Sequence, residues 1–194
     1  MTTVYVIGIS GGTCSGKSTI TDMLEETLHN KYKVAVLRMD DYYEWAKMQT
    51  IAPITRISYP EHNHPSAVDM DKLNNDFLAA VYNKTNDIVI IEGIFAFYFE
   101  HLREKLDLKV FIDLKSDERI YRRIKRMIAH EAIDEIAQRY LDTVRYRHDE
   151  FVEPTRWYAD IVINGNKDVN VGVDIITSCI ESKINKINKK GLHP

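Results

Sequence analysis

The chain has 194 residues with 44% apolar and 28% charged side chains, which favours a single domain over residues 1–194, large enough to bury a core. Its formal net charge of −3 differs from the strongly basic charge that is typical of nucleic-acid-binding proteins. No apolar run approaches the roughly 20 residues that span a membrane. Because MTTVYVIGIS shows no signal-peptide pattern and Cys14 and Cys179 are far apart, we expect a soluble, cytoplasmic protein without disulfides.

Short apolar segments alternate along the chain with segments of helical periodicity. The expected strands are Val4–Ile9, Val34–Leu37, Asp87–Ile91, Val110–Asp113 and Ala159–Ile163. The expected helices are Ser18–Asn30, Asp71–Tyr82, Ser116 to about Ala129, Ile133 to about Glu150, and about Val169–Ile187. Wholly apolar strands that alternate with helices predict an α/β fold, with a parallel sheet covered by helices on both faces.

Residues 40–69 break this alternation. The segment contains Pro53, Pro60 and Pro65 and shows no sustained period, so we predict a long irregular loop. Structureless loops of this length in compact domains are usually functional, and this one also carries His62 and His64.

The segment Gly11–Ser18 matches the phosphate-binding pattern G-x-x-x-x-G-K-[ST], between an expected strand and an expected helix. Glycines allow successive backbone N–H groups to converge on phosphate oxygens, and the helix directs its positive end at the same anion. Lys17 is expected to reach the β- and γ-phosphates, and the Ser18 hydroxyl to bind Mg²⁺. The predicted triphosphate-binding residues are Gly11, Gly12, Thr13, Cys14, Ser15, Gly16, Lys17, Ser18 and Thr19.

Acidic residues follow two of the expected strands, at the sheet edge where α/β proteins bind ligands. Asp40 and Asp41 suit deprotonation of an acceptor hydroxyl or Mg²⁺ binding, with a solvated turn as the alternative. Tyr43 offers a flat ring and a hydroxyl to an acceptor, unless it simply packs. Glu92 ends an apolar strand, where we expect it near the metal, and a helix cap is the alternative.

The segment ERIYRRIKRM predicts an arginine-rich helix. Arg119 and Arg123 are one turn apart, as are Arg122 and Arg126, so each pair shares a helix face that could close over transferring phosphate oxygens. The alternative is a solvated charged helix, which we expect above all for Arg119 and Lys125.

Six stretches together resemble the uridine kinase family, in the group that includes phosphoribulokinase and nicotinamide riboside kinase. They are GISGGTCSGKST, MDDYY, HPSAVD, IIEGIFAFY, FIDLKSDERIYRRIKR and QRYLDTVRYRHDEFVEPTRWYADIVI. The resemblance implies a three-layer P-loop kinase fold with a five-stranded parallel sheet, a helical lid at about 116–135 and an acceptor-side loop at about 40–69.

Family roles can be carried over onto matching positions of this chain. The resemblance assigns Asp40 as the base, places Ser18, Asp40 and Glu92 around Mg²⁺, and puts Lys17, Arg122 and Arg126 on the transferring phosphate. It further implies that Asp40 and Tyr43 contact the acceptor and that Arg123 belongs to the start of the lid. We also expect Asn63 and Arg123 on the acceptor side, while His62 contacts the substrate or nothing.

Three departures from the family pattern fall on the acceptor side. Asn63 stands where pyrimidine kinases usually have Asp before His-Pro, and only residues 83–86 occupy the place of the family's pyrimidine-gripping β-hairpin. The lid reads RMIAHEAIDE instead of continuing into Arg-Asp and Arg-Gly-Arg.

We therefore expect a kinase that uses ATP and Mg²⁺ to phosphorylate a primary hydroxyl, with uridine or cytidine as the leading acceptor, giving the 5′-monophosphate. Another riboside, a sugar or a pantothenate-like alcohol stays open, as do a non-catalytic nucleotide-binding regulatory protein and a nucleotide-driven switch. We expect no nucleic-acid or membrane partner, and a homo-oligomer is possible. The sequence leaves the choice between ATP and GTP open.

Overall fold

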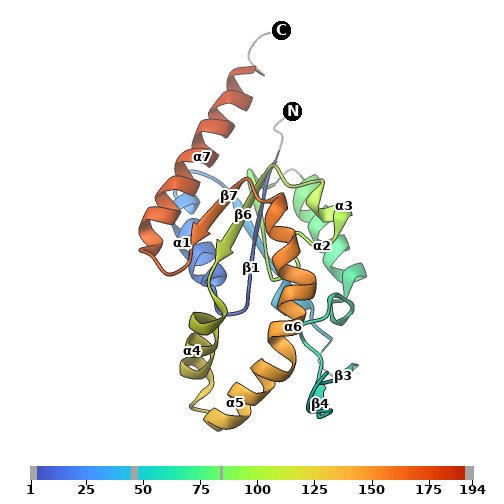
Figure 1. Cartoon of the computed structure of the whole chain (residues 1–194). Helices are drawn as coiled ribbons and strands as arrows, with labels where there is room; N and C mark the ends of the chain where they lie inside the picture. The colour runs from blue at the N-terminus through green and yellow to red at the C-terminus, as the bar shows by residue number, and fades with distance from the viewer. Residues whose placement is uncertain (1–3, 45–47, 84, 191–194) are drawn as a thin grey trace.

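The computed structural model describes residues 4–44, 48–83 and 85–190, and its centre is a five-stranded parallel sheet in the order β2-β5-β1-β6-β7 (Figure 1). The strands are β1 (Tyr5–Gly11), β2 (Val34–Arg38), β5 (Ile88–Glu92), β6 (Leu108–Asp113) and β7 (Ile161–Asn164). All neighbouring pairs are parallel. The predicted α/β class and the number of strands in this sheet are confirmed.

Helices cover both faces of the sheet, because alternate side chains of each strand point to opposite sides. On one face, Ile7 and Ile9 pack in a core with Leu24 of α1 (Lys17–His29) and Ile176 of α7 (Val169–Lys190). On the other face, Val6 shares a core with side chains of α2 (Met70–Tyr82) and α3 (Glu100–Arg103). Sequence periodicity missed α3, which has only four residues. Among the described residues, no helix is long and apolar enough to span a membrane.

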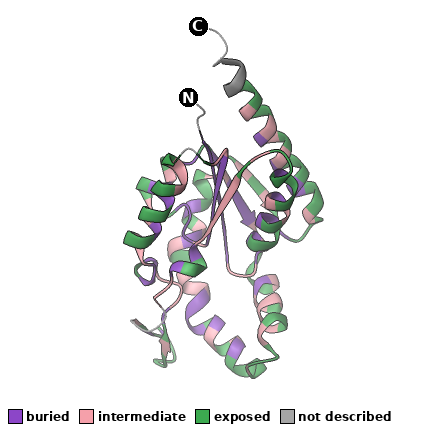
Figure 2. Ribbon diagram, turned by 180° about the vertical axis from the view of Figure 1, so that it is seen from behind, coloured by how far each residue is buried: buried purple, intermediate pink, exposed green. Residues whose placement is uncertain are grey.

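A helical arm extends beyond the carboxyl ends of the strands (Figure 1). It consists of α4 (Ser116–Met127), α5 (Ile133–Arg139), η3 (Tyr140–Val144), α6 (Arg145–Arg147), η4 (His148–Val152) and η5 (Glu153–Tyr158). The predicted helix from Ile133 to about Glu150 is present, but η3 and η4 are wider π-helical turns within it. This helix buries one side, as the purple residues of Figure 2 show.

Residues 40–69 are more ordered than predicted. They include two short 3₁₀ turns, η1 (Met39–Tyr42) and η2 (Pro65–Ala67), and an antiparallel β3–β4 hairpin formed by β3 (Gln49–Ile51) and β4 (Ser58–Pro60). The prediction of an irregular loop was wrong, because three-residue strands are too short to give a detectable period. The described residues between α2 and β5 form no strand, in agreement with the expectation that no hairpin occupies this place.

Candidate nucleotide and acceptor site

The loop between β1 and α1 is shaped to receive an anion. Gly11 and Gly16 have φ values of +144° and +104°, and a Cβ on Gly11 would lie 2.4 Å from the carbonyl oxygen of Ile112. Only glycine tolerates this combination of backbone conformation and close approach. The first turn of α1 has no side-chain cap and no acidic residue, so its first N–H groups are available to phosphate oxygens.

Three side chains meet beside this loop. The Lys17 ammonium donates a hydrogen bond to the Gly12 carbonyl over 3.1 Å and lies 4.0 Å from Glu92 Oε1. The Ser18 hydroxyl donates to Glu92 Oε2 over 3.3 Å. Glu92 reaches this point because it ends β5, where the sheet register pairs it with Ile9 on one side and Arg38 on the other.

Burial sets the electrostatics of this trio. It lowers the pKa of Lys17, although the carboxylates of Glu92 and Asp40 act in the opposite direction. Burial also raises the pKa of Glu92, against the attraction of Lys17. Burying the charges of Lys17 and Glu92 therefore costs desolvation free energy, which a bound polyphosphate with its cation would offset.

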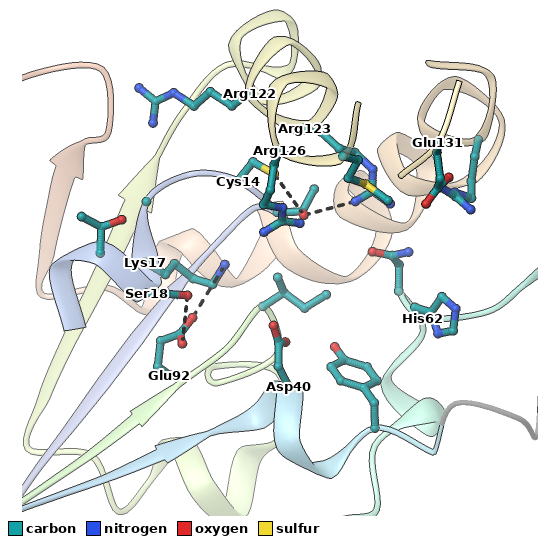
Figure 3. A pocket seen from close by; sticks show the side chains of 18 residues that line it. Cys14, Lys17, Ser18, Asp40, His62, Glu92, Arg122, Arg123, Arg126 and Glu131 are labelled. Atoms are coloured by element: carbon teal, nitrogen blue, oxygen red, sulfur yellow. Dashed lines mark hydrogen bonds and ion pairs between the residues drawn. The ribbon is translucent and has the colours of Figure 1, made fainter. Parts of the chain in front are cut away.

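The trio opens into a cavity of about 580 Å³ (Figure 3). Its lining residues come from the phosphate-binding loop, the ends of β2 and β5, the 62–63 segment and the helical arm: Thr13, Cys14, Gly16, Lys17, Ser18, Thr19, Asp40, Tyr43, His62, Asn63, Glu92, Ile94, Arg122, Arg123, Arg126, Met127, Glu131 and Arg139. The lining omits Gly11, Gly12 and Ser15, which are buried, and Asp41, which was considered beside Asp40; it contains the other predicted nucleotide, metal and acceptor residues.

The predicted acceptor residues gather on one side of the cavity. Asp40 lies on η1 directly after β2 and is exposed to the cavity. Burial raises the pKa of Tyr43, and the nearby Asp40 carboxylate adds to this effect. Burial lowers the pKa of His62, and the guanidinium groups of Arg139 and Arg123 act in the same direction. A phenol and an imidazole that stay neutral suit an uncharged acceptor.

The arginines of α4 do not all face the phosphate-binding loop equally. Arg123 Nη1 lies 3.5 Å from the Thr13 hydroxyl, and Arg126 lines the same part of the cavity. Arg122 instead donates to the carbonyl oxygen of Gly165 over 2.9 Å, and Figure 3 shows its guanidinium turned away from Arg123. In this geometry Arg122 connects α4 to the loop after β7.

Arg119 corrects a prediction. We expected it to be solvated, but it is only 3% exposed and packs behind the phosphate-binding loop, where a Cβ on Gly12 would lie 2.6 Å from Arg119 Nη1. Arg119 shares a helix face with Arg123, and that face turns toward the loop. Lys125 is exposed, as predicted, and its ammonium lies 4.5 Å from the centre of the Tyr121 ring.

Four lining residues were not predicted: Ile94, Met127, Glu131 and Arg139. Ile94 follows Glu92 by two positions, and Met127 follows Arg123 by one helical turn, so both spacings were available signals. Glu131 lies beyond the end of α4 at Met127, where helical spacing gives no signal. No local pattern marks Arg139, because the packing of α5 beside α4 brings it to the cavity.

The described residues contain no cluster of three or more His, Cys, Asp or Glu side chains that could hold a metal alone. Mg²⁺ is usually bound by one or two carboxylates together with phosphate oxygens and water. The Ser18 hydroxyl and the Glu92 carboxylate, with Asp40 across the cavity, fit that manner of binding.

Comparison with known proteins identifies relatives along most of the chain. The family model described as Phosphoribulokinase / Uridine kinase family matches residues 78–172. The uridine kinase of Lactococcus lactis subsp. lactis (strain IL1403) is 33% identical, covering 95% of this chain and 100% of the relative. The uridine kinase of Staphylococcus aureus (strain JH9) is also 33% identical, over 96% of this chain and 100% of the length of that enzyme.

Solved structures share the fold. A putative fructose transport system kinase from Silicibacter sp. TM1040 has a TM-score of 0.65 at 16% identity, and the match covers 84% of this chain and 90% of that kinase chain. A possible uridine kinase from Bacillus stearothermophilus has a TM-score of 0.51 at 20% identity with the same coverage. At these identities the likeness concerns the fold alone.

Proposed function

The chain belongs to the phosphoribulokinase/uridine kinase family and is an ATP-dependent phosphotransferase, and we propose that it transfers the γ-phosphoryl group of ATP to the 5′-hydroxyl of uridine or cytidine. One observation carries the proposal. A single cavity joins the phosphate-binding loop and Lys17 to Asp40, Tyr43 and the 62–63 segment, so donor and acceptor can meet at one carboxylate. The uridine kinases among the relatives support a pyrimidine nucleoside as the acceptor.

The donor side positions the triphosphate. Backbone N–H groups of residues 11–19 and the positive end of α1 hold the phosphate oxygens, and Lys17 contacts the transferring group. Ser18, Glu92 and Asp40 would hold Mg²⁺, which supplies charge neutralisation on the β- and γ-phosphates when bound.

Asp40 acts as the base. It accepts the proton of the acceptor hydroxyl as the hydroxyl oxygen attacks the γ-phosphorus in line. The bond from the γ-phosphorus to the β,γ-bridging oxygen breaks, and ADP leaves. Arg123 and Arg126 from α4 offset the negative charge that spreads over the transferring oxygens, and the arm limits access of water to them.

The acceptor contacts Tyr43, His62 and Asn63. The Asn63 N–H donates to Glu61 Oε1 over 2.7 Å, which fixes the backbone at this point of the cavity. A second candidate acceptor is another riboside, a sugar or a pantothenate-like alcohol, because Asn63 and the short connection before β5 differ from the pattern of pyrimidine kinases.

The test compares Asp40→Asn with Asp41→Asn, since both residues are exposed neighbours on η1. Asp40→Asn should reduce phosphoryl transfer to uridine by about 10²- to 10⁴-fold while ATP affinity is retained. Asp41→Asn should stay close to wild type. Radiolabelled transfer from ATP and equilibrium ATP binding measure the two properties. Wild-type protein that binds Mg-ATP but phosphorylates neither uridine nor cytidine would refute the proposed acceptor.

A further inference from the structure

An ion pair borders the cavity on the side across from Lys17, Ser18 and Glu92. Arg139 Nη2 contacts Glu131 Oε2, and both side chains are only partly exposed, at 26% and 28%. In Figure 3, Glu131 and His62 lie across the cavity from Lys17, Ser18 and Glu92, with Asp40 between the two groups. The pair thus lies beyond the carboxylate that we assign as the base.

A second hollow shows that this pair is a boundary. Its volume is about 450 Å³, and it is lined by Tyr59, Asp134, Glu135, Gln138 and the same Glu131 and Arg139. Since both hollows share only these two side chains, the pair separates them. A molecule that enters the main cavity beside Tyr43 therefore meets the pair at its far end.

The sign of the Glu131 charge restricts what it can bind. A carboxylate repels triphosphate oxygens, and Lys17 and Ser18 of the phosphate-binding loop lie across the cavity from Glu131 (Figure 3). The Arg139 guanidinium carries five N–H donors, and its contact with Glu131 Oε2 is made through Nη2. The pair presents an oxygen acceptor beside guanidinium donors.

We propose that Glu131 and Arg139 determine acceptor specificity, a role that rests on the proposed kinase function. Glu131 accepts a hydrogen bond from an N–H or O–H of the acceptor, and Arg139 donates to the adjacent oxygen or ring nitrogen. The acceptor is consequently uncharged and carries a donor beside an acceptor atom, as the edges of uracil and cytosine do. Because Glu131 already pairs with Arg139, it competes with an acceptor carboxylate, such as that of pantothenate, for this guanidinium.

The experiment measures kcat and KM for uridine, cytidine, ribose and pantothenate, together with KM for ATP. The variants are Glu131→Gln, Arg139→Gln and Arg139→Lys. The control is Glu181→Gln, because Glu181 forms a 2.7 Å ion pair with Lys31 outside the cavity. Loss of a hydrogen bond to a charged group should raise KM for the pyrimidine nucleoside about 10- to 100-fold in Glu131→Gln and Arg139→Gln.

Three further results are expected. KM for ATP should change less than about threefold, because Glu131 lies across the cavity from Lys17 and Ser18. The nucleoside KM of Arg139→Lys should lie between the values of wild type and Arg139→Gln, because lysine keeps the positive charge but lacks the paired N–H donors of a guanidinium. Glu131→Gln should narrow the preference for uridine over pantothenate.

The outcomes separate this inference from the proposed function. Suppose that wild type phosphorylates uridine or cytidine. If the variants then leave the nucleoside KM unchanged, or raise KM for ATP by the same factor as KM for the nucleoside, the proposed role of the pair is wrong and the proposed function stands. If wild type uses ribose but no nucleoside, and the variants raise that KM, the nucleoside assignment fails and the pair's role stands. A wild type that prefers pantothenate, or phosphorylates none of the four, overturns both.

Discussion

Arg147 Nε donates a hydrogen bond to Glu61 Oε2 over 2.9 Å, and the Glu61 side chain is 1% exposed. The second oxygen of Glu61 accepts the N–H of Asn63, and Arg147 Nη2 lies 3.3 Å from the Thr50 hydroxyl. The segment that carries His62 is therefore fixed to the helical arm by a buried ionic contact. The acceptor side of the cavity depends on this connection.

Arg147→Leu should lower the free energy of unfolding by about 2–4 kcal/mol, because it leaves the Glu61 carboxylate buried without its cation. Chemical denaturation measures the change. The matched control is Glu150→Gln, which removes the more exposed partner of Arg147 and should change stability by less than about 0.5 kcal/mol. Equal effects of the two variants would show that burial of Glu61 is not the deciding factor.

Asp142→Ala should release the β3–β4 hairpin from the arm. The Asp142 carboxylate accepts hydrogen bonds from Thr55, Tyr59 and Gln138, and the first two belong to the hairpin. Burial acts to raise the pKa of Asp142, but these hydrogen bonds outweigh it and lower the pKa. Amide hydrogen exchange in residues 49–60 should accelerate about 10- to 100-fold while the sheet stays protected.

The control for the hairpin is Asp149→Ala, an exposed carboxylate on the same arm. It should leave exchange in residues 49–60 at the wild-type rate. Unchanged exchange in Asp142→Ala would mean that strand pairing alone, and not docking, holds the hairpin.

His148 makes stability depend on pH. Burial lowers its pKa to about 3, and the charges of Arg119 and Lys17 act in the same direction. Glu153 Oε2 lies 3.2 Å from His148 Nε2, but this carboxylate is 43% exposed and does not offset burial. Since the pKa is about 6.5 in the unfolded chain, the unfolded state binds more protons between about pH 6.5 and pH 3.

Stability should therefore fall as the pH falls through that window, by up to about 1.4 kcal/mol per pH unit from this residue. Urea unfolding at pH 7, 6, 5 and 4 should show a steeper loss for wild type than for His148→Gln. The control is His29→Gln, which changes an exposed residue at the end of α1. Parallel pH profiles of wild type and His148→Gln would contradict the prediction.

Cys14 should report nucleotide binding. It lies in the phosphate-binding loop with a φ of +59° and lines the cavity. Mg-ATP at ten times its Kd should slow alkylation of Cys14 by iodoacetamide about tenfold, because only the unliganded fraction reacts. Peptide mass spectrometry measures this rate beside that of Cys179 on α7, which is outside the cavity and should not respond. Equal protection of both thiols would indicate a global effect.

Much of the donor side follows from local sequence. The glycines and Lys17 are neighbours in the chain, so their spacing alone predicts an anion-binding turn between a strand and a helix. Glu92 was predicted in the same way, because the end of a buried parallel strand must reach the ligand-binding edge of the sheet. The roles of these residues in phosphoryl transfer stay predictions.

Only the tertiary structure showed how the acceptor side is held in place. Tyr59 and Asp142 are 83 positions apart, Glu61 and Arg147 are 86 apart, and no local period connects either pair. Arg119 is buried, against expectation, because the fold turns one face of α4 toward the phosphate-binding loop. The sequence by itself determined the strand–loop–helix unit and the sheet, which depend on residue spacing. Long-range packing determined which charged side chains are buried, paired or presented to the acceptor.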